Sequence, residues 1–229
     1  MDRNLLGRLA VVGLALGLIA GACGGSAATS SVDPSVETTA APSPSTTASS
    51  ASTIASSAVI VAFPDPASVD AWRNVDDSVM GGVSDSTSSW VDVDGGAMEF
   101  TGDLSTENNG GFASTLSPVD RTFGARAVGA GALRVSAQGD GRTYLLQLRA
   151  GANGSDRWIS RFTPAADGAT GSSAIDLPIA SFEAVNGFLR PVTPTGPLDP
   201  ATITQIGVYV LDGQVGRFRL VLVSITPVR

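Results

Sequence analysis

Short runs of apolar and β-branched residues, separated by glycine-rich turns, recur from Val61 to the end of the chain. The clearest runs form consecutive pairs: 89–93 with 97–100, 132–137 with 143–149, and 206–211 with 218–225. In the last run Phe218, Leu220 and Leu222 share one face of a strand, because side chains alternate along it. Pairs of this kind, joined by short turns, predict β-hairpins.

Helical signals are few in the same region. The stretches 68–72 and 181–185 predict single helical turns, and the proline-rich segment 190–200 is expected to form an irregular crossover. Many short strands at intervals of about 8–15 residues are typical of an antiparallel sandwich or barrel. The sequence therefore predicts one all-β, mostly antiparallel domain over residues 61–229, with long connections of the Greek-key or jelly-roll kind.

A different pattern precedes this domain. An arginine-containing start leads into an apolar run over 9–20, which ends in Ala20-Gly21-Ala22 before Cys23. The run is shorter than the roughly 20 residues that span a bilayer, so residues 1–22 predict an export signal. The position of Cys23, the only cysteine, resembles the lipobox of bacterial lipoproteins, whose cysteine is lipidated after cleavage. An ordinary cleavage site is the alternative.

Residues 23–60 consist mostly of Ser, Thr and Ala, interrupted by prolines. This composition buries too little apolar surface to offset the entropy of ordering, and it predicts a disordered tether. A tether of this length spans about 30–35 Å. We therefore expect the domain on the extracytoplasmic face of the bacterial cell membrane, anchored there through the lipid on Cys23.

Charge and composition exclude several functions. The net charge is −7, all bases are arginine, and no basic run occurs, so a nucleic-acid partner is not expected. Histidine is absent, and the one cysteine is assigned to lipidation. Ser-His-Asp and Cys-His catalytic sites and thiolate or imidazole zinc sites therefore cannot be built. No nucleotide-binding motif is present, and no cofactor is predicted.

Carboxylate pairs are the remaining route to catalysis, as in glycosidases. The nominal candidates are Asp76, Asp77, Glu99, Glu107 and Glu183. Asp76 and Asp77 are adjacent, so on a regular strand they would point to opposite faces and form no such pair. We predict a protein that is not an enzyme.

The stretch 72–84 is the most unusual part of the chain. It contains a tryptophan, two adjacent aspartates, Met80 and the pair Gly81-Gly82. The glycines permit a tight return, and Asp76 or Asp77 is expected to accept hydrogen bonds from nearby loop N–H groups. Trp72 and Met80 are expected to pack beneath the domain. Direct contact with a ligand, or a calcium ion bound through oxygens near the aspartates, are the alternatives.

Four ordered motifs carry a resemblance to a known family. They are residues 72–84, residues 107–114, residues 139–144, and Ile206-Gly207 together with residues 216–220. In this order they resemble the complex I intermediate-associated protein 30 family over about residues 63–226. The resemblance implies a galactose-binding-domain-like jelly-roll β-sandwich. For mitochondrial members it implies a non-catalytic role in assembling the NADH:ubiquinone oxidoreductase.

The combined reading is a membrane-tethered β-sandwich binding module that engages a protein partner, in assembly of a respiratory or envelope complex. A carbohydrate- or cell-wall-binding module is the alternative, because the implied fold serves both uses. Trp158 is a candidate for stacking on sugar rings, since it follows a polar loop. The complete set of candidate ligand or partner residues is Asp76, Asp77, Met80, Ser84, Asn108, Asn109, Arg142, Tyr144 and Trp158.

Overall fold

The computed structural model describes residues 59–166 and 171–229. The predicted export signal (1–22), Cys23 and all of the predicted tether up to residue 58 lie outside the described residues. None of the helices in the described part of the chain has the length and apolar character needed to cross a bilayer.

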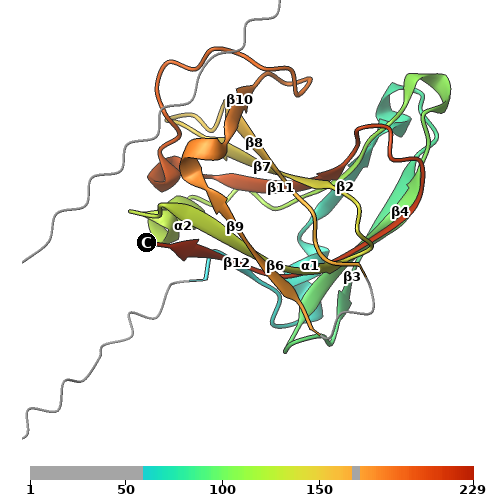
Figure 1. The fold of residues 1–229 in the computed structure, drawn as a ribbon, viewed down its shortest axis with the longest axis horizontal. Coiled ribbons are helices and arrows are strands. Elements are labelled where there is room, and N and C mark those ends of the chain that lie inside the picture. Colours follow the sequence, from blue (N-terminus) through green and yellow to red (C-terminus); the bar gives the residue numbers. More distant parts are fainter. Residues whose placement is uncertain (1–58, 167–170) are drawn as a thin grey trace, which may run out of the picture. The chain divides into compact units, whose positions relative to one another are not determined.

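Two antiparallel sheets pack face to face, which confirms the all-β sandwich (Figure 1). Sheet A contains, in spatial order, β3 (Asp85–Val91), β4 (Ala97–Leu104), β12 (Gly216–Val228), β6 (Ala132–Gly139) and β9 (Ser173–Pro178), with β1 (Val61–Ala62) paired to β12. Sheet B contains β10 (Glu183–Val185), β8 (Asp156–Phe162), β7 (Tyr144–Ala150), β11 (Gln205–Val210), β5 (Ala113–Leu116) and β2 (Arg73–Asp76). The helical elements are α1 (Pro66–Asp70), α2 (Thr122–Ala127) and the 3-10 turns η1 (Asp77–Met80), η2 (Glu107–Asn109), η3 (Ile179–Ser181) and η4 (Pro200–Thr202).

The hydrophobic core lies between the sheets and follows from strand alternation. Phe218, Leu220 and Leu222 of β12 all lie in it, as their spacing predicted. In β7 the residues Leu146 and Leu148 belong to the same core, so the intervening positions point to the outer face of sheet B.

The predicted strand pairs have two different outcomes. The pair around residues 92–96 is a true hairpin, since β3 and β4 are register partners in sheet A. The other two predicted hairpins are wrong, because β6 and β12 belong to sheet A whereas β7 and β11 belong to sheet B. Their short turns cross from one sheet to the other. Repeated crossing of this kind produces the jelly-roll connections.

Of the two predicted helical turns, the structure confirms one. Helix α1 overlaps the expected 68–72 region but begins two residues earlier, and 181–185 is mainly strand β10, preceded by η3. Helix α2 has no counterpart among the sequence predictions. The segment 190–200 contains no strand, as expected for a crossover.

The two ends of the sandwich carry different connections. Asp76, Ala113, Val210 and Tyr144 are successive register partners across sheet B, so they lie at one end, which we name the Asp77 end. The opposite end carries the β7–β8 turn and the loop 186–199. Figure 1 shows this loop and the η1 and η2 segments at opposite ends of sheet B, both extending past it on the side away from sheet A.

Candidate functional site

The carboxylate of Asp77 is fully buried and surrounded by donors. Its Oδ1 accepts the N–H of Ser84 at 2.9 Å, and its Oδ2 accepts the hydroxyl of Ser84 at 2.6 Å and the N–H of Gly111 at 2.6 Å. Burial alone would raise the pKa of Asp77, but these hydrogen bonds outweigh it and hold the pKa below its usual value. The expected bonding to loop N–H groups is confirmed, and the lone pairs are directed at donors rather than at a cation.

The neighbouring Asp76 is in a different environment. Its Oδ1 accepts the hydroxyl of Ser86 at 2.6 Å and, more weakly, the N–H of Ser114 at 3.4 Å. Burial raises the pKa of Asp76, and the negative charge of Asp77 acts in the same direction. Two adjacent carboxylates therefore have opposite pKa shifts, because only Asp77 is enclosed by enough donors.

The tip of the 72–84 stretch is exposed. Gly81 has φ +92°, which supports the expected tight return. The expected burial of Met80 is wrong, because Met80 is 60 % exposed and Val79 is 70 % exposed. Trp72, in contrast, packs against the core and against Phe63, with ring centroids 5.6 Å apart.

Asn108 and Asn109 lie in η2 at the same end and have exposed side chains. Both have positive φ, 54° and 61°, a conformation in which asparagine is favoured among non-glycine residues. These residues make the turn that brings Gly111 to the Asp77 carboxylate.

Arg142 and Tyr144 belong to a second network at the Asp77 end, centred on Asp140. Asp140 Oδ1 accepts the hydroxyl of Tyr144 at 3.1 Å, and its Oδ2 accepts the N–H of Arg219 at 3.0 Å. The Arg142 guanidinium pairs with Asp140 at 3.3 Å and donates to the carbonyls of Gln214 and Val215. Tyr144 is fully buried, and burial raises the pKa of its phenol. This network joins the β6–β7 connection to the β11–β12 connection, which are two places where the chain crosses between the sheets.

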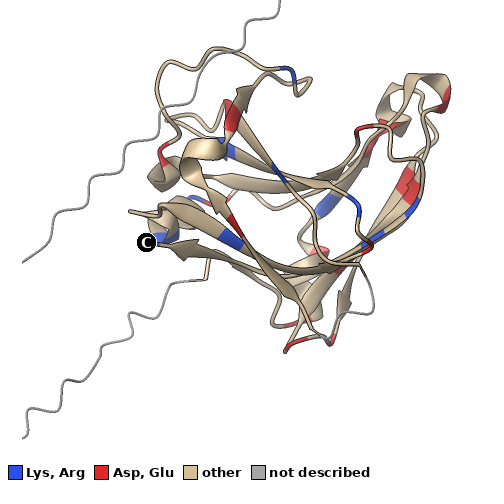
Figure 2. Ribbon diagram, in the orientation of Figure 1, with Lys and Arg blue, Asp and Glu red and all other residues tan. Residues whose placement is uncertain are grey.

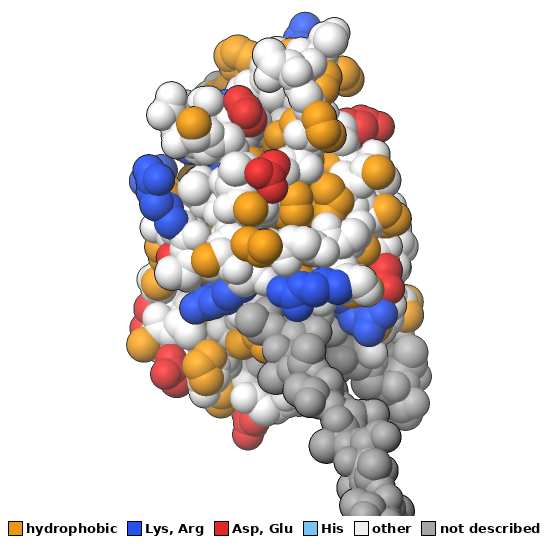
Figure 3. Space-filling view, turned by 90° about the vertical axis from the view of Figure 1, so that its left-hand side faces the viewer, with side chains coloured by type: hydrophobic (Ala, Val, Ile, Leu, Met, Phe, Trp, Pro, Cys, Tyr) orange, Lys and Arg blue, Asp and Glu red, His pale blue; other side chains and the backbone are white. Residues whose placement is uncertain are grey.

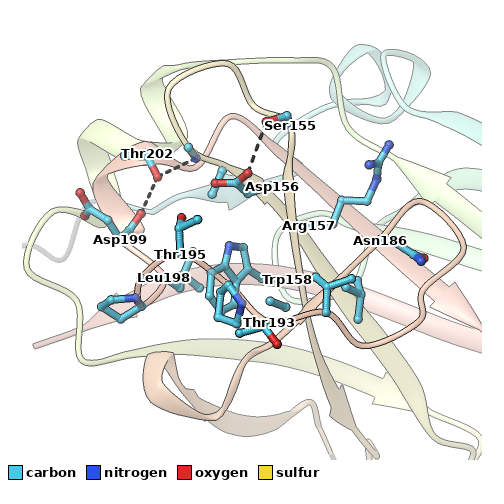
Figure 4. A pocket seen from close by; sticks show the side chains of 18 of the residues that line it. Ser155, Asp156, Arg157, Trp158, Asn186, Thr193, Thr195, Leu198, Asp199 and Thr202 are labelled. Atoms are coloured by element: carbon cyan, nitrogen blue, oxygen red, sulfur yellow. Dashed lines mark hydrogen bonds between the residues drawn. The ribbon is translucent and has the colours of Figure 1, made fainter.

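Trp158 lies at the opposite end. Its exposure is 7 %, and it belongs to the core, so it is not the exposed stacking platform that the sequence indicated. One part of it lines a cavity of about 480 Å³ beneath the loop 186–199, together with Thr193, Thr195 and Leu198 (Figure 4). Figure 3 shows this end of the domain, where hydrophobic side chains lie among polar ones.

The outer face of sheet B carries a polar group that sequence reasoning missed. Arg149 on β7 and Arg157 on β8 are direct register partners. Next to them the Tyr209 hydroxyl donates to Gln147 Oε1 at 3.3 Å. Gln147 is 3 % exposed, and its amide nitrogen has no hydrogen-bond partner among the described residues. An unpartnered buried donor costs about 1–3 kcal/mol. We call Gln147, Arg149, Arg157 and Tyr209 the arginine-pair cluster.

A tight turn places an exposed aromatic beside this cluster. The Asn186 side chain accepts the N–H groups of Phe188 at 2.8 Å and Arg190 at 3.1 Å, which holds the turn in one conformation. Phe188 is 80 % exposed at its tip. The next residue, Leu189, packs on the outer face of sheet B against Leu145 and Ile159.

The outer faces of the two sheets differ in charge, and Figure 2 marks the positions of the charged residues along the ribbon. By strand alternation, the strands of sheet B carry the arginines 73, 149, 157 and 161 and the acid Glu183 on the outer face, and Asp212, which follows β11, pairs with Arg161. The outer face of sheet A carries the acids Asp85, Glu99, Asp103 and Asp176 against the arginines 134, 217 and 219. A basic face therefore exists on an acidic protein.

The nominal catalytic acids are not brought together as a pair. Glu99 lies on β4 and forms an ion pair with Arg219 at 2.7 Å, Glu107 lies in η2, and Glu183 lies on β10 toward the opposite end. The described residues also contain no group of three or more His, Cys, Asp and Glu side chains placed to hold a metal ion.

Comparison with protein families gives one decisive result. The model of the complex I intermediate-associated protein 30 family matches residues 61–222. The chain belongs to this family. The match spans the whole sandwich from β1 into β12 and confirms the resemblance carried by the four motifs. A comparison with curated proteins found no match.

Solved structures with some similarity include carbohydrate-binding domains. The family 11 carbohydrate-binding module of cellulase Lic26A-Cel5E from Clostridium thermocellum has 16 % sequence identity and a TM-score of 0.49, over 69 % of this chain and 88 % of that one. The same module in complex with a β-1,3-1,4-mixed-linked tetrasaccharide has 17 % identity and the same TM-score and coverage. An exo-β-agarase has 9 % identity and a TM-score of 0.37, over 69 % of this chain and 23 % of that one.

Proposed function

We propose that this family member is a non-catalytic binding module that engages a protein partner through the outer face of sheet B. The exposed side chain of Phe188 is the main observation that supports this proposal. A phenylalanine that is 80 % exposed, on a turn held by two side-chain hydrogen bonds, is a rigid apolar contact without a partner of its own in the described structure. Aromatic side chains, phenylalanine included, are enriched in protein interfaces.

The rest of this face has the composition of a protein interface. Aromatic residues, methionine and arginine are enriched in interfaces, and lysine is depleted there. The face contains Tyr209 and a pair of arginines between the Phe188 turn and the exposed Val79-Met80 tip at the other end. A partner lying along sheet B would contact both apolar tips and the polar centre.

The proposed setting is the extracytoplasmic surface of a bacterial membrane, with the domain anchored through lipidated Cys23. The family name refers to association with intermediates of complex I. For this chain we propose the broader role of assisting assembly of a respiratory or envelope complex, because the tether would hold the domain close to membrane-embedded partners.

Photo-crosslinking in intact cells tests the proposal. A photoreactive phenylalanine analogue at position 188 of the full chain should give a reproducible adduct with one protein. The same analogue at position 87, an exposed site on the outer face of sheet A, should not. Phe188→Ser should compete poorly for the partner without lowering the melting temperature. Equal adducts from both positions, or none from 188, would contradict the proposal.

Glycan binding is the second candidate, and the Trp158 cavity favours it. Its volume of about 480 Å³ lies in the range of small-molecule sites, and threonine hydroxyls line it beside the indole. A bound glycan should change the fluorescence of Trp158, an effect that Trp158→Phe would abolish while keeping the core filled. A saturable glycan response combined with no cross-linked protein would favour this candidate over the first.

A further inference from the structure

The outer face of sheet B contains two arginines in an unusual relationship. Arg149 and Arg157 lie directly opposite each other on neighbouring antiparallel strands and on the same face. Like charges at such positions repel each other and destabilise a sheet. In the described strands, no other register pair joins two arginines.

Neither guanidinium is neutralised within the described structure. Three other strand arginines have acidic partners: Arg134 pairs with Asp176, Arg161 with Asp212 and Arg219 with Glu99. Among the described residues, no carboxylate lies within 4 Å of the Arg149 or Arg157 guanidinium, and the nearby acids Asp212 and Glu183 act on Arg161. The repulsion between the two arginines is therefore uncompensated in the domain by itself.

Polar groups of the cluster surround the pair. Burial raises the pKa of Tyr209, while Arg149 and Arg157 act in the opposite direction, so both guanidinium groups lie near the phenol. The Gln147 amide nitrogen beside it lacks a partner. Figure 4 shows the Arg157 side chain at the rim of the Trp158 cavity, which it helps to line, and directed away from the indole.

The pair also lies beside the Phe188 turn. A Cβ added to Gly187 would lie 3.9 Å from Arg157 Cζ and Nη1, so the guanidinium sits close under the residue that precedes Phe188. An occupant that covers Phe188 would therefore also reach the arginines. Both features belong to one surface.

We propose that the arginine-pair cluster binds a carboxylate side chain of the protein partner, an aspartate or glutamate next to an apolar residue that contacts Phe188. Two guanidinium groups hold a carboxylate through charge-assisted hydrogen bonds, and the ligand relieves the repulsion between them. The proposal rests on the proposed function, since it specifies the chemistry of that partner.

A matched pair of small probes tests the site without the partner. N-acetylglutamate amide should shift the arginine side-chain Nε–H NMR signals of residues 149 and 157 in the full chain in a saturable way. N-acetylglutamine amide, which has the same shape without the charge, should bind at least tenfold more weakly. Arg149→Gln and Arg157→Gln should each abolish the shifts, whereas Arg217→Gln, on sheet A, should leave them unchanged.

Three results would overturn the proposal. The first is an unchanged response in Arg149→Gln and Arg157→Gln. The second is an equal response to both probes. The third is saturation by inorganic phosphate at a tenfold lower concentration, which would assign the site to a phosphate-bearing ligand. Both variants should retain the wild-type melting temperature or exceed it at low salt, so loss of binding cannot be attributed to unfolding.

Cross-linking from position 188 separates this proposal from the proposed function. In the Arg149→Gln/Arg157→Gln double variant the adduct yield should fall at least tenfold, and high salt should produce a similar fall in the wild-type chain. If the adduct yield of the double variant is unchanged, the proposed binding of a protein partner is retained and the proposed carboxylate contact is wrong. If the wild-type chain gives no adduct, the proposed function fails, and the probe titration alone decides the chemistry of the site.

Discussion

Ser84 donates both its backbone N–H and its hydroxyl to the carboxylate of Asp77, at 2.9 Å and 2.6 Å. The same carboxylate accepts the N–H groups of Gly111 and Phe112, which precede β5 in the other sheet. One buried anion thus joins the start of sheet A to the start of a strand in sheet B. The motif around Asp77 is a structural junction of the sandwich.

Replacing Asp77 tests this role. Asp77→Ala leaves the buried donors of Ser84 and Gly111 without an acceptor, and should lower the free energy of unfolding by about 2–4 kcal/mol. Chemical denaturation of the full chain measures the effect. Ser78→Ala, an exposed change on the same turn, is the control and should have almost no effect. A stable Asp77→Ala variant that loses partner binding would show that the residue contacts the ligand instead.

The two aspartates should affect acid stability with opposite signs. The pKa of Asp77 is lowered in the folded state, so its contribution is present above the unfolded pKa of about 3.9 and is lost as pH falls through the folded value. The pKa of Asp76 is raised, so its ionisation opposes folding as pH rises through that value. Asp77→Asn should therefore destabilise more at pH 7 than at pH 3, and Asp76→Asn should show the reverse trend.

Thermal unfolding of both variants from pH 3 to pH 7 measures these slopes. Parallel pH profiles for Asp76→Asn and Asp77→Asn would contradict the assignment of opposite environments.

Adjacent glycines should respond differently to alanine. A Cβ at Gly82 would overlap the Asp77 carboxylate, whereas a Cβ at Gly81 meets nothing within 4 Å and suffers only from its φ of +92°. Gly81→Ala should cost about 1–2 kcal/mol, and Gly82→Ala should cost more, because the anion must move away from its donors. Equal decreases in the free energy of unfolding for Gly81→Ala and Gly82→Ala, measured by denaturant unfolding, would show that the Asp77 carboxylate is not held tightly.

The Asp140 network predicts a smaller effect. Tyr144→Phe removes one hydroxyl donor at 3.1 Å but keeps the buried ring, so it should lower stability by about 1 kcal/mol. Asp140→Ala should cost more, since it also removes the acceptor for the Arg219 N–H and the partner of Arg142. Double-mutant cycles with Tyr144→Phe measure the coupling, which would be absent if the contacts acted independently.

The proposed membrane anchor has a direct test at Cys23. Cys23→Ser should abolish incorporation of a labelled fatty acid and move the chain from the membrane fraction to the soluble fraction. Ser26→Cys in the Cys23→Ser background is a control for position, since a displaced cysteine should not restore the anchor. Membrane association that survives Cys23→Ser would contradict lipidation at this residue.

Local sequence was sufficient for the six strands of the three predicted pairs but not for their assignment to sheets, and it predicted a helical turn where β10 lies. The runs at 132–137 and 206–211 are strands because of local alternation and flanking glycines. Their short turns are the same length as hairpin turns, yet Asp140 and Arg142 bind residues that lie more than 70 positions away and direct the chain across the sandwich. A local pattern contains no signal for that choice.

For the candidate sites, too, local sequence revealed some features and missed others. The hydrogen bonding of an aspartate to loop N–H groups could be predicted from the motif, because the glycines near Asp77 indicate a constrained backbone. Met80 was misplaced because an apolar side chain at a turn tip is buried only if another element covers it, and none of the described elements does. The arginine-pair cluster was missed because Arg149 and Arg157 become neighbours only through the register of β7 and β8.

The sequence by itself determined the all-β class, the family, and the exclusion of histidine-based chemistry, because composition and short-range alternation record these properties directly. The tertiary structure decided which donors enclose Asp77, which strands cross between the sheets, and which uncompensated charges share a face. These relationships join residues that are not neighbours along the chain, and only strand register and packing bring them together.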